Sequence, residues 1–214
     1  MARELWAQQL GVDIGIRKIL DGAELKVVAG EMVVVTGPSG SGKTTLLLVM
    51  AGLQNPDRGQ VLLDGKPLAS SGDLRHRIGM VLQNHGLVAV LTAAENVAIA
   101  LQARGTRRTE VTKRTAEILA ALGLSDHADR LVRDLSGGQR QRVGVARALV
   151  GAPEVLLADE PTSELDVERR ALVLNLLRAH AQLGHIVIVA SHDQIVAEAA
   201  DRTLGLVDGR PASV

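Results

Sequence analysis

The sequence predicts an α/β fold, with a mostly parallel sheet core and a helical subdomain inserted near residues 88–150. Short apolar runs typical of buried strands alternate with amphipathic, helix-like segments along most of the chain. A glycine-rich turn at 37–42 joins one such run, 31–36, to a helical segment. From 92 to 122 the pattern is helical, which interrupts the alternation and indicates the inserted block.

Each element is assigned from its local pattern. The run of valines within 31–36 is continuous and apolar, as in strands that are buried on both faces. Gly105 and Thr106 divide the helical block, and Gly151 and Pro153 end the helix that starts near 137. The expected elements are strands at 3–10, 23–28 and 31–36, a helix at 44–51, strands at 60–63 and 78–82, helical segments at 92–122 and 137–150, a strand at 155–158, a helix at 167–183, a strand at 186–190, a helix at 194–199 and a last strand at 203–207.

The composition excludes several classes of function. The 214 residues include no cysteine, so disulfides, thiol catalysis and cysteine-ligated metal centres are excluded. The 24 Lys and Arg residues balance the 24 Asp and Glu residues, and we therefore expect no nucleic-acid partner. The longest stretch without a charged residue, 78–94, is shorter than the roughly 20 residues that a membrane-spanning helix needs. We therefore expect a soluble chain.

A phosphate-binding loop follows the valine-rich strand. Residues 37–44 read Gly-Pro-Ser-Gly-Ser-Gly-Lys-Thr, which is the P-loop pattern. Glycines let the backbone turn tightly and point its N–H groups at phosphate oxygens, and the helix that starts here adds its positive N-terminal end. Lys43 is expected to reach the β- and γ-phosphates and Thr44 to hold Mg²⁺. The predicted nucleotide-binding residues of this segment are Gly37, Pro38, Ser39, Gly40, Ser41, Gly42, Lys43, Thr44 and Thr45.

Two carboxylates and a histidine follow apolar strands. Asp159 comes directly after 155–158 and is expected to help hold Mg²⁺. Because side chains alternate along a strand, Glu160 points elsewhere and is placed to act as general base on an attacking water. His192 follows the strand at 186–190, and ligands of open α/β sheets bind at the carboxyl ends of strands. His192 is therefore expected to reach the γ-phosphate, so that Lys43, Glu160 and His192 are candidate catalytic residues.

Residues 135–139 read Leu-Ser-Gly-Gly-Gln, and with this motif the chain resembles the ATPase subunits of ATP-binding-cassette (ABC) systems. The P-loop, Gln83, this signature, the acidic pair, a D-loop at 163–166 and His192 follow in the family's order. The resemblance covers essentially the whole chain. It implies a single nucleotide-binding domain over 1–214, with a P-loop (RecA-like) core and an N-terminal antiparallel β part at 1–87 and 151–214, and a helical subdomain at 88–150. The wording of 158–162 is most similar to the lipoprotein-release, macrolide-export and cell-division branch.

The resemblance also implies a head-to-tail dimer that encloses two ATP molecules and Mg²⁺. The signature lies at a helix N-terminus, which is a second anion site, and in the family it completes the ATP site of the other subunit. Gln83 is implied to contact Mg²⁺ and the attacking water, and Asp166 to lie at the dimer seam. The signature residues implied to bind the nucleotide are Ser136, Gly137, Gly138 and Gln139.

Partners follow from the same resemblance. We expect the second ATPase subunit to be another copy of this chain, and a separate transmembrane permease to be the membrane partner. The protein is then expected in the cytoplasm, peripheral on the cytoplasmic face of the cell membrane. The motifs are also compatible with an ABC ATPase that transports nothing and regulates a membrane or cofactor-assembly complex. A P-loop kinase is disfavoured, because it has no need of the signature.

The chain departs from the family at the nucleobase. Members usually carry an aromatic residue upstream of the P-loop that stacks on adenine, and here that place falls near Ile14. The chain has no Phe or Tyr, and its single Trp, Trp6, comes too early. Ile14 offers apolar contact but cannot stack on the base. Stacking of an aromatic side chain is worth about 1–3 kcal/mol per base in nucleic-acid sites. We therefore predict weaker nucleotide binding and weak discrimination between ATP and GTP.

Overall fold

The computed structural model describes residues 3–70 and 72–212, and the chain divides into two compact units. We call Met1–Met80, Glu154–Glu160 and Leu177–Val214 the sheet unit, and Val81–Pro153 and Pro161–Leu176 the helical unit. Within the described ranges, no helix is long and apolar enough to cross a membrane.

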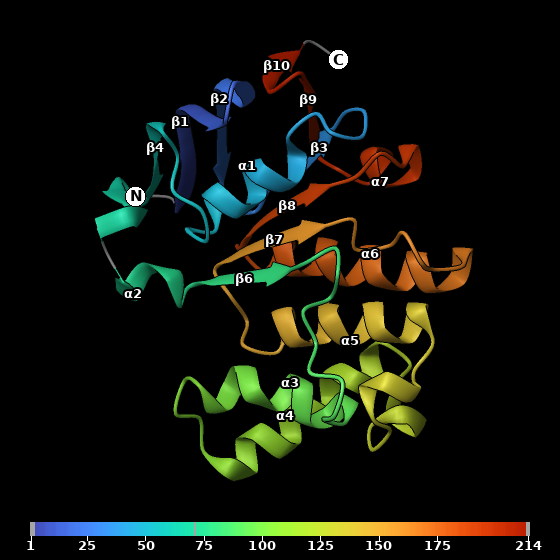
Figure 1. Cartoon of the computed structure of the whole chain (residues 1–214). Helices are drawn as coiled ribbons and strands as arrows, with labels where there is room; N and C mark the ends of the chain where they lie inside the picture. Colours follow the sequence, from blue (N-terminus) through green and yellow to red (C-terminus); the bar gives the residue numbers. More distant parts are fainter. Residues whose placement is uncertain (1–2, 71, 213–214) are drawn as a thin grey trace. The chain divides into compact units, whose positions relative to one another are not determined.

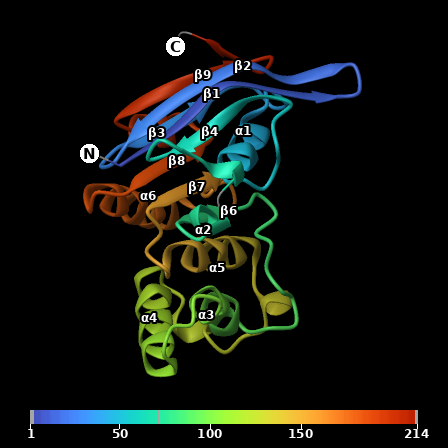
Figure 2. The ribbon, with the colours of Figure 1, turned by 90° about the vertical axis from the view of Figure 1, so that its left-hand side faces the viewer.

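The sheet unit contains a four-stranded antiparallel sheet, in the order β2-β1-β4-β5. Its strands are β1 (Glu4–Ile14), β2 (Arg17–Val28), β4 (Arg58–Leu63) and β5 (Lys66–Pro67). β1 and β2 form a long hairpin and lie side by side along most of their length (Figure 2). Both strands run further toward the turn than their local patterns predict, because pairing between them extends each one beyond its own apolar residues.

A six-stranded sheet makes up most of the rest of this unit, in the order β10-β9-β3-β8-β7-β6 (Figure 1). The neighbours from β9 to β7 are parallel, which confirms the predicted mostly parallel core. The turn at Asp208 and Gly209, both with positive φ, leads into a further antiparallel strand, so the predicted strand at 203–207 is not the last. The bounds are β3 (Met32–Thr36), β6 (Ile78–Val81), β7 (Val155–Asp159), β8 (Ile186–Ala190), β9 (Arg202–Val207) and β10 (Arg210–Ala212).

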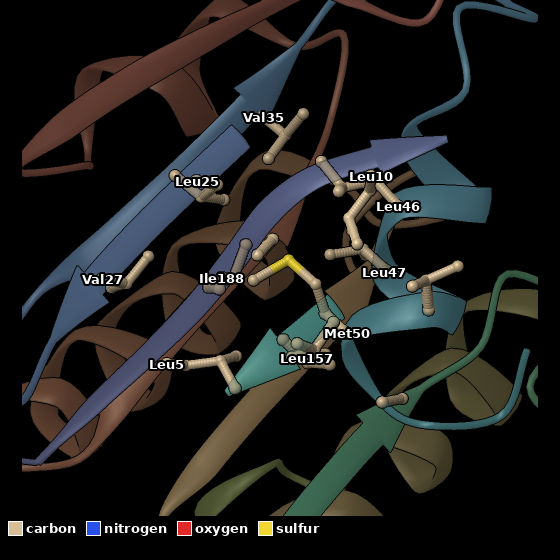
Figure 3. Packing of buried hydrophobic residues seen from close by; sticks show 14 of the residues in the cluster. Leu5, Leu10, Leu25, Val27, Val35, Leu46, Leu47, Met50, Leu157 and Ile188 are labelled. Carbon is tan, nitrogen blue, oxygen red and sulfur yellow. The ribbon is translucent and has the colours of Figure 1, made fainter. Parts of the chain in front are cut away.

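The main hydrophobic core lies between this parallel sheet, the antiparallel sheet and helix α1 (Lys43–Met50). Figure 3 shows Met50 of α1 beside Leu157 of β7 and Ile188 of β8, with Leu5 and Leu10 of β1 in the same cluster. All five side chains are fully buried. Such burial stabilises each side chain by about 1.5–3 kcal/mol, so leucine, valine, isoleucine and methionine build this core without Phe or Tyr.

Short helices complete the sheet unit, and longer ones form the helical unit. Thr92 caps one of the latter with a capping box: its hydroxyl accepts from the Glu95 amide, and the Glu95 carboxylate accepts from the Thr92 amide. The helix α6 begins in the helical unit and ends in the sheet unit. The remaining bounds are α2 (Gly72–Arg75), α3 (Ala93–Gln102), α4 (Arg108–Ala121), α5 (Gly137–Leu149), α6 (Val167–Gln182) and α7 (Gln194–Glu198), with 3₁₀ turns at Leu68–Ser70, Ser125–His127 and Val132–Asp134.

Candidate nucleotide-binding site

The loop between β3 and α1 requires glycine at two positions. Gly37 and Gly42 have φ values of 148° and 101°, which side-chain-bearing residues rarely adopt. A Cβ on Gly37 would lie 2.1 Å from the carbonyl oxygen of Leu206, and a Cβ on Gly42 2.7 Å from that of Ile19. The neighbouring strands thus pack directly against the loop backbone and hold its curvature.

The loop also places polar groups where an anion would satisfy them. The Lys43 side chain is largely buried, and its Nζ donates to the carbonyls of Gly37 and Pro38, at 2.8 and 3.0 Å. Ser41 is 3% exposed, and its Oγ has no hydrogen-bond partner within residues 3–70 and 72–212. A buried hydroxyl without a partner is costly unless a ligand supplies one. The loop therefore fits an oxyanion such as phosphate.

The first predicted metal-binding pair is brought together in the sheet unit. The Thr44 hydroxyl, at the start of α1, donates to Oδ2 of Asp159, at the end of β7, over 2.7 Å. Asp159 is 3% exposed. Burial raises the pKa of this carboxyl, and the hydrogen bond from Thr44 partly opposes the rise. A hydroxyl beside a carboxylate is the kind of all-oxygen donor set that Mg²⁺ prefers.

Glu160 and His192 form the second predicted group. The Nδ1 atom of His192 lies 2.7 Å from Oε1 of Glu160, and the buried Ser191 hydroxyl donates to Oε2 over 3.2 Å. The Glu160 side chain is 12% exposed and that of His192 71%. β7 ends at Asp159 and Glu160 has φ 47°, so its direction comes from a left-handed backbone rather than from strand alternation. Ser191 has no signal in the sequence beyond its place before His192.

The signature residues begin α5 in the helical unit. Ser136 is the N-cap: its Oγ accepts from the Gln139 amide at 3.3 Å, and the Gln139 side chain accepts from the Ser136 amide at 2.9 Å. This capping box satisfies two backbone N–H donors at the N-terminus of α5. It holds Gly137 and Gly138 in the first turn, where backbone N–H groups and the helix dipole favour an anion.

A carboxylate already lies against this turn. Oε2 of Glu164 is 1.9 Å from the position that a Cβ on Gly137 would take. The backbone oxygen of Glu164 is 2.8 Å from the position that a Cβ on Gly138 would take. The Glu164 amide donates to Oε1 of Gln141 at 2.8 Å, and Oε1 of Glu164 lies 4.0 Å from Nε2 of the half-buried His85. Burial lowers the pKa of His85, and the Arg140 and Arg147 charges lower it further, while Glu164 raises it. Sequence reasoning missed this contact because Glu164 lies far along the chain from Gly137 and Gly138.

Two predicted residues belong to the helical unit and not to the sheet unit. Gln83 follows β6 and is exposed. Asp166 precedes α6, and its Oδ1 accepts from the Arg169 amide at 2.8 Å. Their predicted contacts with Mg²⁺, water and the dimer seam stay predictions.

The family model described as ABC transporter matches residues 20–163. The chain belongs to the ABC transporter family. The fold class predicted from the sequence is confirmed by this match and by the solved ABC cassettes described below.

Curated relatives of this ABC chain are named as import proteins. It is 42% identical over 203 residues to "Methionine import ATP-binding protein MetN 2" of Salmonella paratyphi A, covering 90% of this chain and 59% of the relative. It is 43% identical over 198 residues to "Methionine import ATP-binding protein MetN" of Caulobacter vibrioides, covering 89% and 60%. The chain thus spans about three fifths of the length of these relatives. The resemblance to the lipoprotein-release branch stays a prediction.

Two solved structures of the ABC cassette MJ0796 match almost the whole chain. One is titled as a dimeric post-hydrolysis state bound to ADP and Pi, with a TM-score of 0.91 and 32% identity over 98% of this chain and 97% of that one. The other, titled as a dimeric bacterial ABC transporter cassette, gives a TM-score of 0.92 at the same identity and coverage. The described fold is therefore that of an ABC cassette.

Ile14, which stands where other ABC proteins usually carry an aromatic residue, lies in the β1–β2 hairpin. Ile14 is 63% exposed at the end of β1. Trp6 is engaged elsewhere: its Nε1 donates to Glu24 at 3.3 Å, and the Lys26 ammonium lies 5.0 Å from its ring. Trp6 therefore packs within the antiparallel sheet, and the contact of Ile14 with a nucleobase stays a prediction.

Proposed function

We propose that the chain is the ATP-binding and ATP-hydrolysing subunit of a transporter. In this proposal it forms a single nucleotide-binding domain over residues 1–214, with the helical subdomain at 88–150, and drives a separate membrane permease. The proposal is supported by the family match, by the import function in the relatives' names and by the similarity to the MJ0796 dimer bound to ADP and Pi. The observation that carries it is the Glu160–His192 contact of 2.7 Å beside the Thr44–Asp159 pair.

The proposed chemistry is attack of water on the γ-phosphorus of ATP. Glu160 accepts a proton from the water as the new P–O bond forms and the bond to the β-phosphate oxygen breaks. The hydrogen bond from Ser191 and the contact with His192 hold the Glu160 carboxylate in one orientation. Lys43 exchanges the loop carbonyls it now contacts for the β- and γ-phosphates, and Ser41 gains a partner for its buried hydroxyl.

Mg²⁺ fits the oxygen donors at the start of α1 and the end of β7. Thr44 and Asp159 would hold it, and we propose that Gln83 joins them. When bound, the ion neutralises negative charge on the phosphates. The Asp159 carboxyl, whose pKa burial raises, would be held in its ionised form by the charge of a bound ion.

The dimer and the membrane partner belong to the same proposal. Two copies associate head to tail, so that Ser136, Gly137, Gly138 and Gln139 of one copy complete the ATP site of the other. Asp166 then lies at the seam. The permease places the ATPase peripherally on the cytoplasmic face of the cell membrane.

A capture experiment tests the partner. Tagged Glu160→Gln protein, which should bind ATP without hydrolysing it, is expressed in the native cell and purified from membranes in mild detergent with ATP and Mg²⁺. The matched control is tagged Lys43→Ala protein, which lacks the main phosphate contact. We expect a multi-span permease with Glu160→Gln and much less of it with Lys43→Ala. Recovery of soluble proteins alone, with the dimer intact, would favour the ABC ATPase that regulates another complex.

A further inference from the structure

Arg17, the first residue of β2, lies at the rim of the phosphate loop. Its Nη2 is 3.9 Å from the position that a Cβ on Gly40 would take. The strand is fixed to the loop close by, because Ile19 presents its carbonyl to Gly42 and the Gly209 amide donates to the Ser41 carbonyl at 3.1 Å. All of these residues belong to the sheet unit. The guanidinium is therefore held near the loop by the backbone and not by a side-chain partner.

Three basic residues of the β1–β2 hairpin and its surroundings are paired with acids. Lys18 lies 3.3 Å from Asp21, and Arg210 lies 2.6 Å from the same carboxylate. Arg58 lies 2.8 Å from Asp13. These arginine and lysine contacts hold the pKa values of Asp13 and Asp21 below their ordinary range. The Arg17 side chain is exposed, and no hydrogen bond or ion pair joins it to any residue that the structure describes.

We propose that Arg17 is a second phosphate-binding cation of the nucleotide site, in addition to Lys43. An unpaired guanidinium beside a loop that binds a triphosphate is drawn to its charge, and the planar fork donates two parallel N–H bonds to phosphate oxygens. Lys18, the next residue, points to the opposite face of the strand and is already neutralised by Asp21. This inference rests on the proposed function of the loop.

Arg17 also explains how nucleotide is held when the base has little to stack on. Ile14 and Ile16, at the tip of the same hairpin, are 63% and 107% exposed and offer only apolar contact. Contacts to phosphate do not depend on the base. Binding strength thus shifts from the base toward the triphosphate, which ATP and GTP share.

Equilibrium binding of MgATP, MgGTP and magnesium tripolyphosphate tests this assignment in the full chain. We expect Arg17→Ala to weaken all three by roughly tenfold, the scale of one charge-assisted hydrogen bond. Arg17→Lys should recover part of the loss for all three, because the charge is kept. Lys18→Ala is the matched control, and its affinities should stay within about twofold of wild type.

Three other results would overturn either the Arg17 assignment or the proposed function, and each can be told apart. If Arg17→Ala weakens MgATP but leaves tripolyphosphate unchanged, Arg17 acts on the base or ribose and the phosphate assignment is wrong. If all three bind equally well to wild type and Arg17→Ala, the assignment is also wrong while the proposed function stands. If wild-type protein binds neither MgATP nor tripolyphosphate, the proposed function itself fails.

Discussion

At the scale of single residues, two adjacent carboxylates at the end of β7 have different surroundings. Asp159 is buried and receives the Thr44 hydroxyl, whereas Glu160 turns away on a left-handed backbone toward Ser191 and His192. Asp159 therefore faces the start of α1, and Glu160 faces the loop after β8. These different surroundings fit the proposed roles, in which Asp159 binds a metal ion and Glu160 activates a water molecule.

The burial of Asp159 gives a stability prediction with a definite sign. Because its folded pKa is raised, the protonated form is favoured in the fold, and that stabilisation is lost as pH rises through the folded pKa. At pH 7 without nucleotide, Asp159→Asn should thus raise Tm by roughly 2–4 °C, the shift that about 1 kcal/mol gives at this size. The gain should shrink toward pH 4. Thermal melts check it, with exposed Asp126→Asn as control; a lower Tm for Asp159→Asn at pH 7 would refute it.

The missing aromatic at Ile14 predicts weak base selectivity. Wild-type protein should hydrolyse ATP and GTP with comparable kcat/KM, because its nucleobase contact is apolar. Ile14→Tyr should tighten ATP binding about tenfold or more, since stacking is worth about 1–3 kcal/mol per base and the site is 63% exposed. Steady-state kinetics with both nucleotides decide it. A hundredfold preference of the wild type for ATP would rule out this view of the base site.

At the scale of elements, the first turn of α5 depends on two glycines with unequal surroundings. A Cβ on Gly137 meets the end of the Glu164 side chain, which is 45% exposed and free to shift. A Cβ on Gly138 would lie 2.8 Å from the backbone oxygen of Glu164, and this backbone atom is not free to shift. Gly137→Ala should thus leave the free energy of unfolding near wild type, and Gly138→Ala should lower it by about 1–3 kcal/mol. Urea denaturation measures both, and equal stability of the two variants would contradict the packing described.

Elements with a continuous apolar run were predictable, and elements defined by pairing were not. The valines of β3 and the run of β7 are buried at nearly every position, so their patterns alone identify them. The strands β1 and β2 extend to Ile14 and from Arg17 because each pairs with the other, which a local pattern does not record. The short strand β10 depends in the same way on β9. The Glu164 contact with Gly137 and the φ of Glu160 are likewise tertiary features.

At the scale of the whole molecule, the predicted nucleotide contacts divide between the two units. Thr44, Asp159, Glu160 and His192 belong to the sheet unit, and the signature belongs to the helical unit. The order of the motifs along the chain names the residues of both groups, and their contacts with nucleotide stay predictions. It does not predict their partners within each unit, because these depend on the strand order β3-β8-β7 and on the turn at the start of α5.

The most direct test of the central claim is phosphate release from MgATP by purified wild-type and Glu160→Gln protein, with MgATP binding measured in parallel. Loss of a general base costs about 10²- to 10⁴-fold in rate. We predict a loss of that size in Glu160→Gln, with binding retained because Glu160 lies outside the phosphate loop. Equal rates of phosphate release by the two proteins would contradict the assignment of Glu160 as general base. No phosphate release by the wild-type protein would contradict the ATPase function itself.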